Sequence, residues 1–294
     1  MQFGTPPRLL PNRYLSPSGK YTLLVEPTTW GGTGKGRYRL TLDGKTVWQA
    51  VRPFTLQKAG VTDSGTVGGY GYSYGLEGMG SDGEGTLDAV IMDSAGRVRL
   101  CHKTIRKMSR FPDASPDPRA EGVIVDGEHN RLIIRTADAD PNRGQEYWVQ
   151  FQLSTGKKLD TIIPARFNRR DSPERFILDA RPVPDTPFIL LHWWRFAEWR
   201  VGACFTLVMP DARPVWKWEL PNDYEIPGDR NSEDRLQSQI RKSGAITFTK
   251  PGGQFAVRIA KEKRQAHFTV SRTSNNGWQI QEVGRNLRPT LLRL

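Results

Sequence analysis

The chain has 294 residues, 37% of them hydrophobic, and 43 Lys and Arg against 31 Asp and Glu give it a formal charge of +12. This length and apolar content are enough for one large β domain or for two ordinary domains. The two cysteines, Cys101 and Cys204, exclude a disulfide framework and a CxxC metal motif.

No apolar run reaches the length of a membrane span. The first residues lack the basic and apolar regions of a signal peptide. We therefore expect a cytoplasmic protein with no membrane association, or a secreted one if a signal peptide has been removed. Each cysteine lies in an apolar, strand-like run, so both are expected to be buried and reduced.

Two kinds of hairpin turn alternate along the chain, and each kind occurs five times. The first kind lies between β-rich runs and contains Ser, Thr, Asp, Pro or Gly. These turns are residues 16–19, 62–65, 126–129, 184–186 and 250–253. The second kind joins an apolar-alternating run to a second strand through Asp, Ser, Asn or Gly, residues that tight hairpins need for positive φ or for Asx hydrogen bonds. These hairpins are residues 40–48, 89–98, 149–159, 205–216 and 268–278.

Two hairpins per unit, repeated five times, give four strands per unit with no sustained helical period. This pattern predicts an all-β chain, a β-propeller of about five four-stranded antiparallel blades that forms a single domain over residues 1–294. The predicted blades are residues 8–52, 53–107, 120–163, 175–220 and 235–284. A double β-sandwich and two small β domains are the alternative folds.

The turns 16–19 and 62–65 and the fourth strands 44–48 and 213–216 resemble the repeats of WD40-like and quinoprotein-like propellers. The Gly-His and Trp-Asp pairs of true WD40 blades are absent. The resemblance therefore implies an architecture and no functional residue.

The long connections fall between second and third strands and between blades, which in a propeller lie on one face. Binding sites tend to occupy such loops. In the fourth blade and the basic loop before it, Trp and Arg residues of the kind found at binding hot spots gather. The predicted binding residues are Trp194, Arg195, Trp199, Arg200, Arg166, Arg169 and Arg170. The competing interpretation is that the tryptophans pack in the core and the arginines are solvated.

Asp138, Asp140 and Asn142 have the alternate spacing of calcium ligands. Arg143 stands where an EF-hand loop requires Gly, and the closing Glu is missing, so no metal and no other cofactor is predicted. The four histidines lie in different blades and no GxSxG motif occurs, so no catalytic residue is predicted.

The sequence therefore favours a non-catalytic interaction module that binds a protein through its long-loop face, with an anionic polymer as a second kind of partner. A carbohydrate-binding or glycoside-active propeller is the first alternative function, and a nucleic-acid-binding propeller is the second. The oligomeric state is not predicted.

Overall fold

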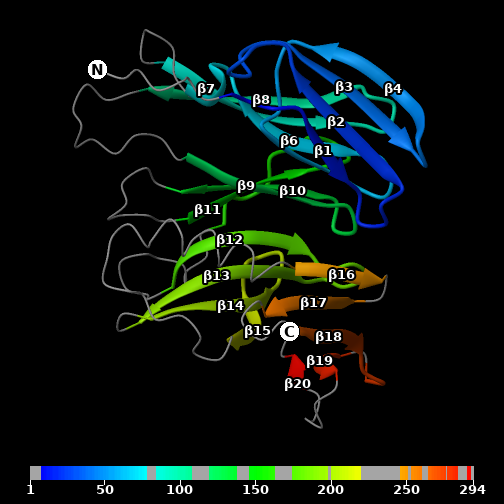
Figure 1. The fold of residues 1–294 in the computed structure, drawn as a ribbon, viewed down its shortest axis with the longest axis vertical. Helices are drawn as coiled ribbons and strands as arrows, with labels where there is room; N and C mark the ends of the chain where they lie inside the picture. The colour runs from blue at the N-terminus through cyan, green and yellow to red at the C-terminus, as the bar shows by residue number, and fades with distance from the viewer. Residues whose placement is uncertain are drawn as a thin grey trace. The chain divides into compact units, whose positions relative to one another are not determined.

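Strands form nearly all of the structure, a computed structural model that describes residues 8–77, 84–107, 119–137, 146–162, 174–197, 200–219, 246–250, 253–259, 264–275, 277–283 and 290–292. Within these ranges the helical content is one 3-10 turn, η1 (Gly75–Glu77). The chain divides into two compact units, Met1–Ile162 and Ile163–Leu294. Every sheet lies within one unit and is antiparallel, with strands in chain order (Figure 1).

The first unit contains three sheets. The first sheet is β1 (Asn12–Leu15), β2 (Tyr21–Pro27), β3 (Gly36–Leu42) and β4 (Lys45–Arg52). The second is β5 (Lys58–Val61), β6 (Val67–Tyr72), β7 (Glu84–Met92) and β8 (Val98–Lys107). The third is β9 (Arg119–Asp126), β10 (Arg131–Ala137) and β11 (Glu146–Gln152).

The second unit contains two sheets. The fourth sheet of the chain is β12 (Glu174–Pro182), β13 (Ile189–Ala197), β14 (Arg200–Val208) and β15 (Pro214–Glu219). The fifth is β16 (Ile246–Lys250), β17 (Gln254–Ile259), β18 (Arg264–Arg272), β19 (Trp278–Val283) and β20 (Thr290–Leu292). The predicted fold class is confirmed: the chain is all-β and has the sheet sequence of a five-bladed propeller.

Turns of the first kind close on a hydroxyl side chain in the first two sheets. The Ser16 N–H donates to the Tyr21 carbonyl (3.0 Å), and Ser16 Oγ accepts from the Tyr21 N–H (3.2 Å). Thr62 repeats both bonds with Thr66, at 2.9 Å and 3.0 Å. Each side chain thus satisfies a backbone donor that the narrow hairpin would leave open.

Turns of the second kind depend on residues that tolerate positive φ. Asp43 and Gly44 join β3 to β4 at φ 48° and 79°, as a two-residue type I′ hairpin requires. Asp93 caps the β7–β8 turn, where its Oδ1 accepts from the N–H groups of Ala95 (2.9 Å) and Arg97 (3.0 Å). The strands that flank the ten predicted turns are paired as the sequence predicts, except that the strand after the 149–159 hairpin is reduced to isolated bridges.

β7 contributes to two cores because both of its faces are buried. Val90 and Met92 pack with residues of the first sheet, including Leu23 and Leu40. Ile91 lies on the opposite face and packs with residues of the third sheet. Burying a large apolar side chain stabilises the fold by about 1.5–3 kcal/mol, so this central strand joins the three sheets of the first unit.

Aromatic rings join the two sheets of the second unit. Within the fifth sheet Phe255 stacks on Phe268 with ring centroids 5.1 Å apart, and the Trp216 ring of the fourth sheet meets Phe268 edge-on at 5.3 Å. Phe188 meets Trp278 edge-on at 5.5 Å. Such pairs contribute about 0.5–1.5 kcal/mol beyond the burial of their surface.

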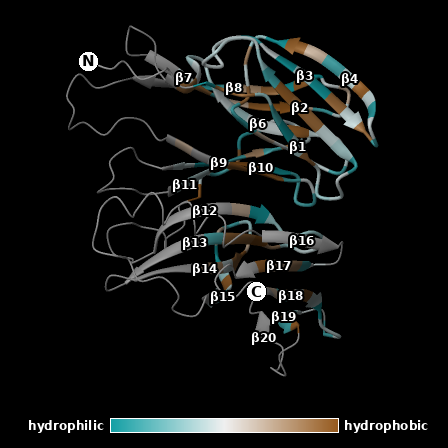
Figure 2. Cartoon of the chain, in the orientation of Figure 1, coloured by the Kyte–Doolittle hydropathy of each residue, from teal (hydrophilic) through white to brown (hydrophobic). Residues whose placement is uncertain are grey.

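Two sheets depart from the predicted four strands. In the third, the fourth strand is reduced to two isolated bridges, Phe151 with Lys158 and Trp148 with Ile162. In the fifth, β20 adds a fifth strand by pairing with β19. Exposed arginines alternate with buried residues along the first part of β3 (Figure 2), as expected of a strand with one face in a core.

The predicted connection 195–201 is wrong as a long loop. β13 runs to Ala197 and β14 begins at Arg200, and these two residues pair directly. Arg195 and Arg200 are therefore strand residues. The residues of β13 and β14 stay paired without a break through this segment, including Phe196 with Val201.

Candidate functional site

Long connections from the first two sheets meet at one end of the first unit. The β2–β3 loop (28–35) and the β4–β5 link (53–57) are joined where Thr55 Oγ1 donates to the Gly34 carbonyl (3.1 Å). The Leu76 N–H of η1, which follows β6, donates to the Gly31 carbonyl (2.8 Å). These contacts define the long-loop face of this unit; the tight turns lie at the opposite ends of the strands.

The β2–β3 loop is held in a fixed shape although much of it is exposed. Thr29 Oγ1 donates to the Thr33 carbonyl (2.8 Å), and the Leu9 N–H donates to the Trp30 carbonyl (2.9 Å). The Arg8 guanidinium lies over the Trp30 ring, 4.5 Å from its centroid. The Trp30 side chain is nevertheless 51% exposed.

Gly75 lets η1 approach the β2–β3 loop. Its φ is +66°, and a Cβ at this position would lie 2.1 Å from the Gly31 carbonyl oxygen. No other residue type fits there without moving backbone. Leu76 of η1, which makes this contact through its N–H, is 37% exposed, so it is a second exposed apolar residue of the long-loop face.

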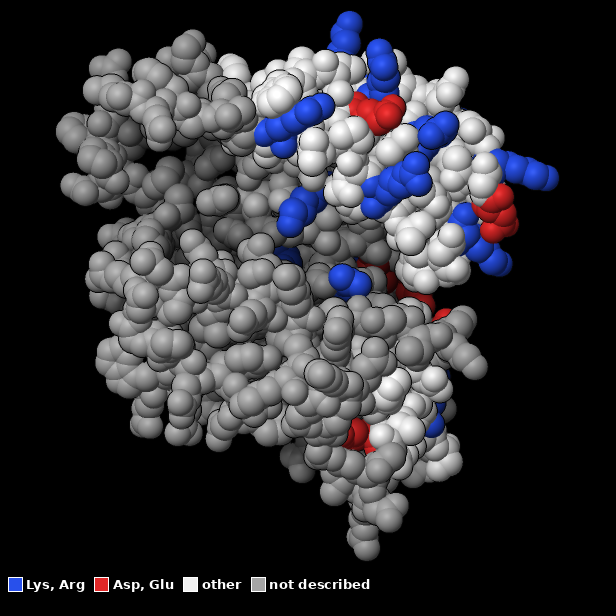
Figure 3. Space-filling model, viewed as in Figure 1, with Lys and Arg blue, Asp and Glu red and all other residues white. Residues whose placement is uncertain are grey.

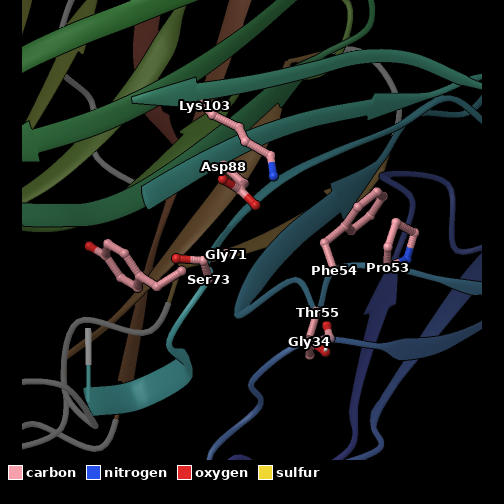
Figure 4. A pocket seen from close by; sticks show the side chains of 9 residues that line it. Gly34, Pro53, Phe54, Thr55, Gly71, Ser73, Asp88 and Lys103 are labelled. Carbon is pink, nitrogen blue, oxygen red and sulfur yellow. Dashed lines mark hydrogen bonds between the residues drawn. The ribbon is translucent and has the colours of Figure 1, made fainter. Parts of the chain in front are cut away.

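A pocket of about 70 Å³ lies between these loops and the end of the second sheet (Figure 4). It is lined by Gly34, Pro53, Phe54, Thr55, Gly71, Tyr72, Ser73, Asp88 and Lys103. Asp88 and Lys103 are cross-strand partners on β7 and β8, and Figure 4 shows the Lys103 amine pointing toward the Asp88 carboxyl. Strand alternation places Asp88 on the same face of β7 as Val90 and Met92, where the first sheet packs.

Burial raises the pKa of the Asp88 carboxyl above its ordinary value, and the hydrogen bond from Thr86 Oγ1 (2.8 Å) and the charge of Lys103 offset only part of this rise. A buried carboxyl in a pocket is a candidate for ligand binding or proton transfer. The pocket holds only a few water molecules at about 10–15 Å³ each, whereas small-molecule sites are typically about 300–1,000 Å³. Its size therefore suits ordered water and not a sugar ring.

All seven predicted binding residues fall where the side chains are not described. Trp194 and Arg195 lie on β13, with backbones opposite Ala203 and Gly202 of β14. Trp199, Arg166, Arg169 and Arg170 lie outside the described residues, as do Asp138, Asp140 and Asn142. The arrangement of these side chains is therefore outside what the structure describes, and their roles stay predictions.

Three residues of the long-loop face escaped the sequence analysis. Trp30 and Leu76 lie in connections identified as long loops, but their exposure depends on contacts between those loops. Asp88 lies inside the apolar run 87–92. A lone carboxylate in such a run is a usable signal for a buried polar site, because unpaired charges are rarely buried.

The two cysteines differ in their exposure to solvent. Cys204 is buried and free, as predicted, whereas Cys101 is free but exposed. The prediction that Cys101 is buried is wrong: it lies on β8, an edge strand that has a hydrogen-bonded neighbour on one side only.

No helix in the described ranges is long and apolar enough to cross a bilayer. Among the same residues, no group of three or more His, Cys, Asp or Glu side chains could hold a metal ion.

Comparisons with known proteins give a resemblance of fold. No protein-family model matches the sequence, and no curated protein matches it. The Dos1 propeller aligns with 95% of this chain at 11% identity and a TM-score of 0.38, and the chain spans 57% of its length. The Nup133 β-propeller domain of Vanderwaltozyma polyspora aligns with 97% of this chain and 75% of its own at 10% identity and a TM-score of 0.41.

An endo-arabinase from Bacteroides thetaiotaomicron aligns with 99% of this chain and 95% of its own, at 10% identity and a TM-score of 0.37. At these identities the likenesses concern the fold alone. No function follows from them.

Proposed function

We propose that the chain is a non-catalytic interaction module that binds a protein or other macromolecular partner through its long-loop face. The main support is Trp30, which is 51% exposed on a loop fixed by hydrogen bonds and by the Arg8 guanidinium. Trp and Arg dominate the energetics of protein interfaces. An exposed apolar group on an ordered loop is already held in its binding conformation, which lowers the entropy cost of association.

The pocket beside this face is too small to be a carbohydrate site. A glycoside-active or carbohydrate-binding protein needs a cavity that accepts a sugar ring and usually two carboxylates or stacked aromatic rings. The Asp88 pocket has one carboxylate and a volume of about 70 Å³. This pocket is therefore not a candidate carbohydrate site.

The proposal extends to the fourth sheet. Trp194 and Arg195 lie toward the end of β13, and Arg200 begins the strand that follows. With Trp199 and the basic residues Arg166, Arg169 and Arg170, they would provide an aromatic anchor with a basic rim for an acidic protein or an anionic polymer. The variants Trp199→Ala and Arg169→Glu/Arg170→Glu test this part: the first is expected to weaken binding and the second to slow association and change its salt dependence.

Affinity capture from native-host extract tests the proposed face of the first unit. The baits are the wild type, the variant Trp30→Ala/Leu76→Ala, and a control variant Val47→Ala/Val98→Ala. The control valines are 46% and 40% exposed, so they match the test residues as exposed apolar side chains. They lie near the tight turns and therefore outside the proposed binding face. We expect a partner that is retained by the wild type and the control and depleted about tenfold or more by the test variant, since hot-spot residues contribute at least about 2 kcal/mol.

A further inference from the structure

The pocket of the first unit contains a buried carboxyl group with one unsatisfied oxygen. Asp88 is 4% exposed and lines the pocket from β7. Its Oδ1 accepts the hydrogen bond from Thr86 Oγ1 (2.8 Å), and no described residue donates to its Oδ2. A buried carboxylate oxygen needs a donor, so Oδ2 marks a position for a donating ligand atom or an ordered water.

Two donors line the same pocket. Lys103 is the cross-strand partner of Asp88, and Figure 4 shows its amine pointing toward the carboxyl. No ion pair among the described residues joins Lys103 to Asp88, so the two groups do not satisfy each other. Ser73 Oγ accepts from the Thr86 N–H (3.0 Å), which leaves the hydroxyl proton of Ser73 for a ligand.

Hydrogen bonds fix these groups before any ligand binds. Thr86 holds both Ser73 Oγ, through its N–H, and Asp88 Oδ1, through its hydroxyl. On the other side of the pocket in Figure 4, Thr55 Oγ1 donates to the Gly34 carbonyl (3.1 Å). Groups that are positioned in advance lose little entropy on association. The pocket is therefore a preformed site.

The charges of the pocket favour a neutral ligand. An ammonium group at Asp88 would meet the like charge of Lys103, and a carboxylate at Lys103 would meet that of Asp88; such contacts cost free energy. A primary amide carries its donor and its acceptor on separate atoms. It can therefore donate to Asp88 and accept from Lys103 at the same time, which a single hydroxyl oxygen does less well across a gap.

The size of the pocket fits the same group. A volume of about 70 Å³ holds roughly five water molecules, about the space that a primary amide and its adjoining methylene fill. Pro53 and Phe54 offer apolar contact to the methylene. Replacing ordered water loses no affinity when the incoming group reproduces the hydrogen bonds of the water.

The pocket adjoins the long-loop face. All of its lining residues belong to the first unit, and one of them, Gly34, lies in the same β2–β3 loop as Trp30. A partner bound over Trp30 therefore has the pocket within reach of its side chains.

We propose that this pocket receives the side-chain amide of an Asn or Gln residue of a protein partner that binds the long-loop face. The amide nitrogen donates to Asp88 Oδ2, and the amide oxygen accepts from Lys103 Nζ, with Ser73 Oγ as a second donor. The inference rests on the proposed function and specifies a protein among the macromolecular partners.

The test uses acetamide as the probe, with acetate and methylammonium as charged controls, and follows the backbone amide signals of Gly71, Ser73 and Thr86 by NMR. Figure 3 shows Lys and Arg side chains gathered over β1–β4, so an anion is attracted to this unit without entering the pocket. Physiological ionic strength, where the Debye length is about 8 Å, screens that attraction. We expect acetamide to shift these signals saturably and to bind at least about threefold more tightly than either charged probe.

Variants of the pocket identify the contacts. Asp88→Leu removes the acceptor and should weaken acetamide binding at least about tenfold, because hydrogen bonds to charged groups are the stronger ones. Lys103→Met removes a donor from an exposed residue and should weaken binding about threefold. The matched control is Lys58→Met, which removes the same charge from an exposed residue outside the pocket and should leave binding unchanged. Thermal melts establish folding, and Lys103→Met with its control carries the test if Asp88→Leu does not fold.

The inference is overturned if acetamide causes no saturable shift, if a charged probe binds as tightly as acetamide, or if Lys58→Met weakens binding as much as Lys103→Met. In affinity capture, Lys103→Met should deplete the partner of the long-loop face and Lys58→Met should not; equal retention by the two would also overturn it. Acetamide reports on the pocket alone. A partner that requires Trp30 and Leu76, together with no acetamide binding, would contradict this inference and leave the proposed function standing, whereas acetamide binding without any partner would contradict the proposed function.

Discussion

The Arg8 guanidinium lies 4.5 Å from the centroid of the Trp30 ring, and the N–H of Leu9, the residue after Arg8, donates a hydrogen bond to the Trp30 carbonyl at 2.9 Å. The segment before β1 is thus attached to the β2–β3 loop at two points. The loop presents Trp30 in one orientation and leaves half of its surface open to a partner.

Replacing Trp30 by Ala should weaken binding of the partner but leave the stability of the fold nearly unchanged. An exposed cation–π pair contributes about 0.5–1 kcal/mol, so Trp30→Ala should lower the free energy of unfolding by no more than about 1 kcal/mol, measured by urea denaturation. Trp30→Phe keeps a ring under Arg8 and should be closer to the wild type. A loss of several kcal/mol in Trp30→Ala would mean that Trp30 is a structural residue.

Gly75→Ala should disrupt the contact between the two loops. The added methyl group meets the Gly31 carbonyl oxygen at 2.1 Å, and overpacking against backbone costs about 1–3 kcal/mol. Gly34→Ala is the control, because Gly34 also has positive φ (+69°) but no atom within 4 Å of an added Cβ. Its cost is the conformational strain alone, about 1–2 kcal/mol.

Hydrogen exchange measures this difference locally. The amides of residues 28–35 should exchange faster in Gly75→Ala than in Gly34→Ala. Equal exchange in the two variants would contradict the close approach of η1 to the β2–β3 loop.

Stability should fall at alkaline pH through His129. The hydrogen bond from its Nδ1 to Asp126 Oδ2 (2.7 Å) raises the pKa of His129 above 6.5, although burial opposes the rise. A raised pKa in the folded state stabilises fully below the unfolded value and is lost as pH rises through the folded value. Urea unfolding from pH 5.5 to 8.5 should show this loss in the wild type, and His129→Gln should lack it.

Asp63 should have the opposite pH dependence. Burial alone would raise the pKa of Asp63, but hydrogen bonds from Ser18 Oγ (2.6 Å) and the Ser18 N–H (2.9 Å) outweigh it and lower the pKa below 3.8. The resulting stability is present above about 3.8 and is lost as pH falls through the lower folded value. Ser18→Ala removes one of these bonds, so it should reduce the loss of stability on acidification; an unchanged acid profile would contradict the link between the turns of the first two sheets.

The positions of the hairpin turns could be predicted from the sequence, because they depend on residues within each turn. Asp43 and Gly44 identify their hairpin because few other residues adopt two successive positive φ angles. Ser16, Thr62 and Asp93 identify other turns because their side chains accept backbone hydrogen bonds there. The short fourth segment of the third sheet and the pairing of β20 with β19 were not predictable in this way, because they depend on contacts between separate segments.

The candidate site was less accessible from the sequence. Trp30 lies in a loop that was identified, but whether a loop tryptophan is exposed depends on neighbours such as Arg8 and Gly75. Asp88 is hidden in an apolar run.

Site-specific photo-crosslinking in the native host tests most directly whether the long-loop face binds a macromolecular partner. A photoreactive phenylalanine analogue replaces Thr33 on the β2–β3 loop or, as the control, Thr46 beside the Asp43–Gly44 turn. Mass spectrometry then identifies the crosslinked species. The proposed function predicts a discrete adduct with another macromolecule from position 33 that is absent from position 46 and is lost when Trp30→Ala is added. The same adducts from both positions, or adducts from position 46 alone, would contradict it.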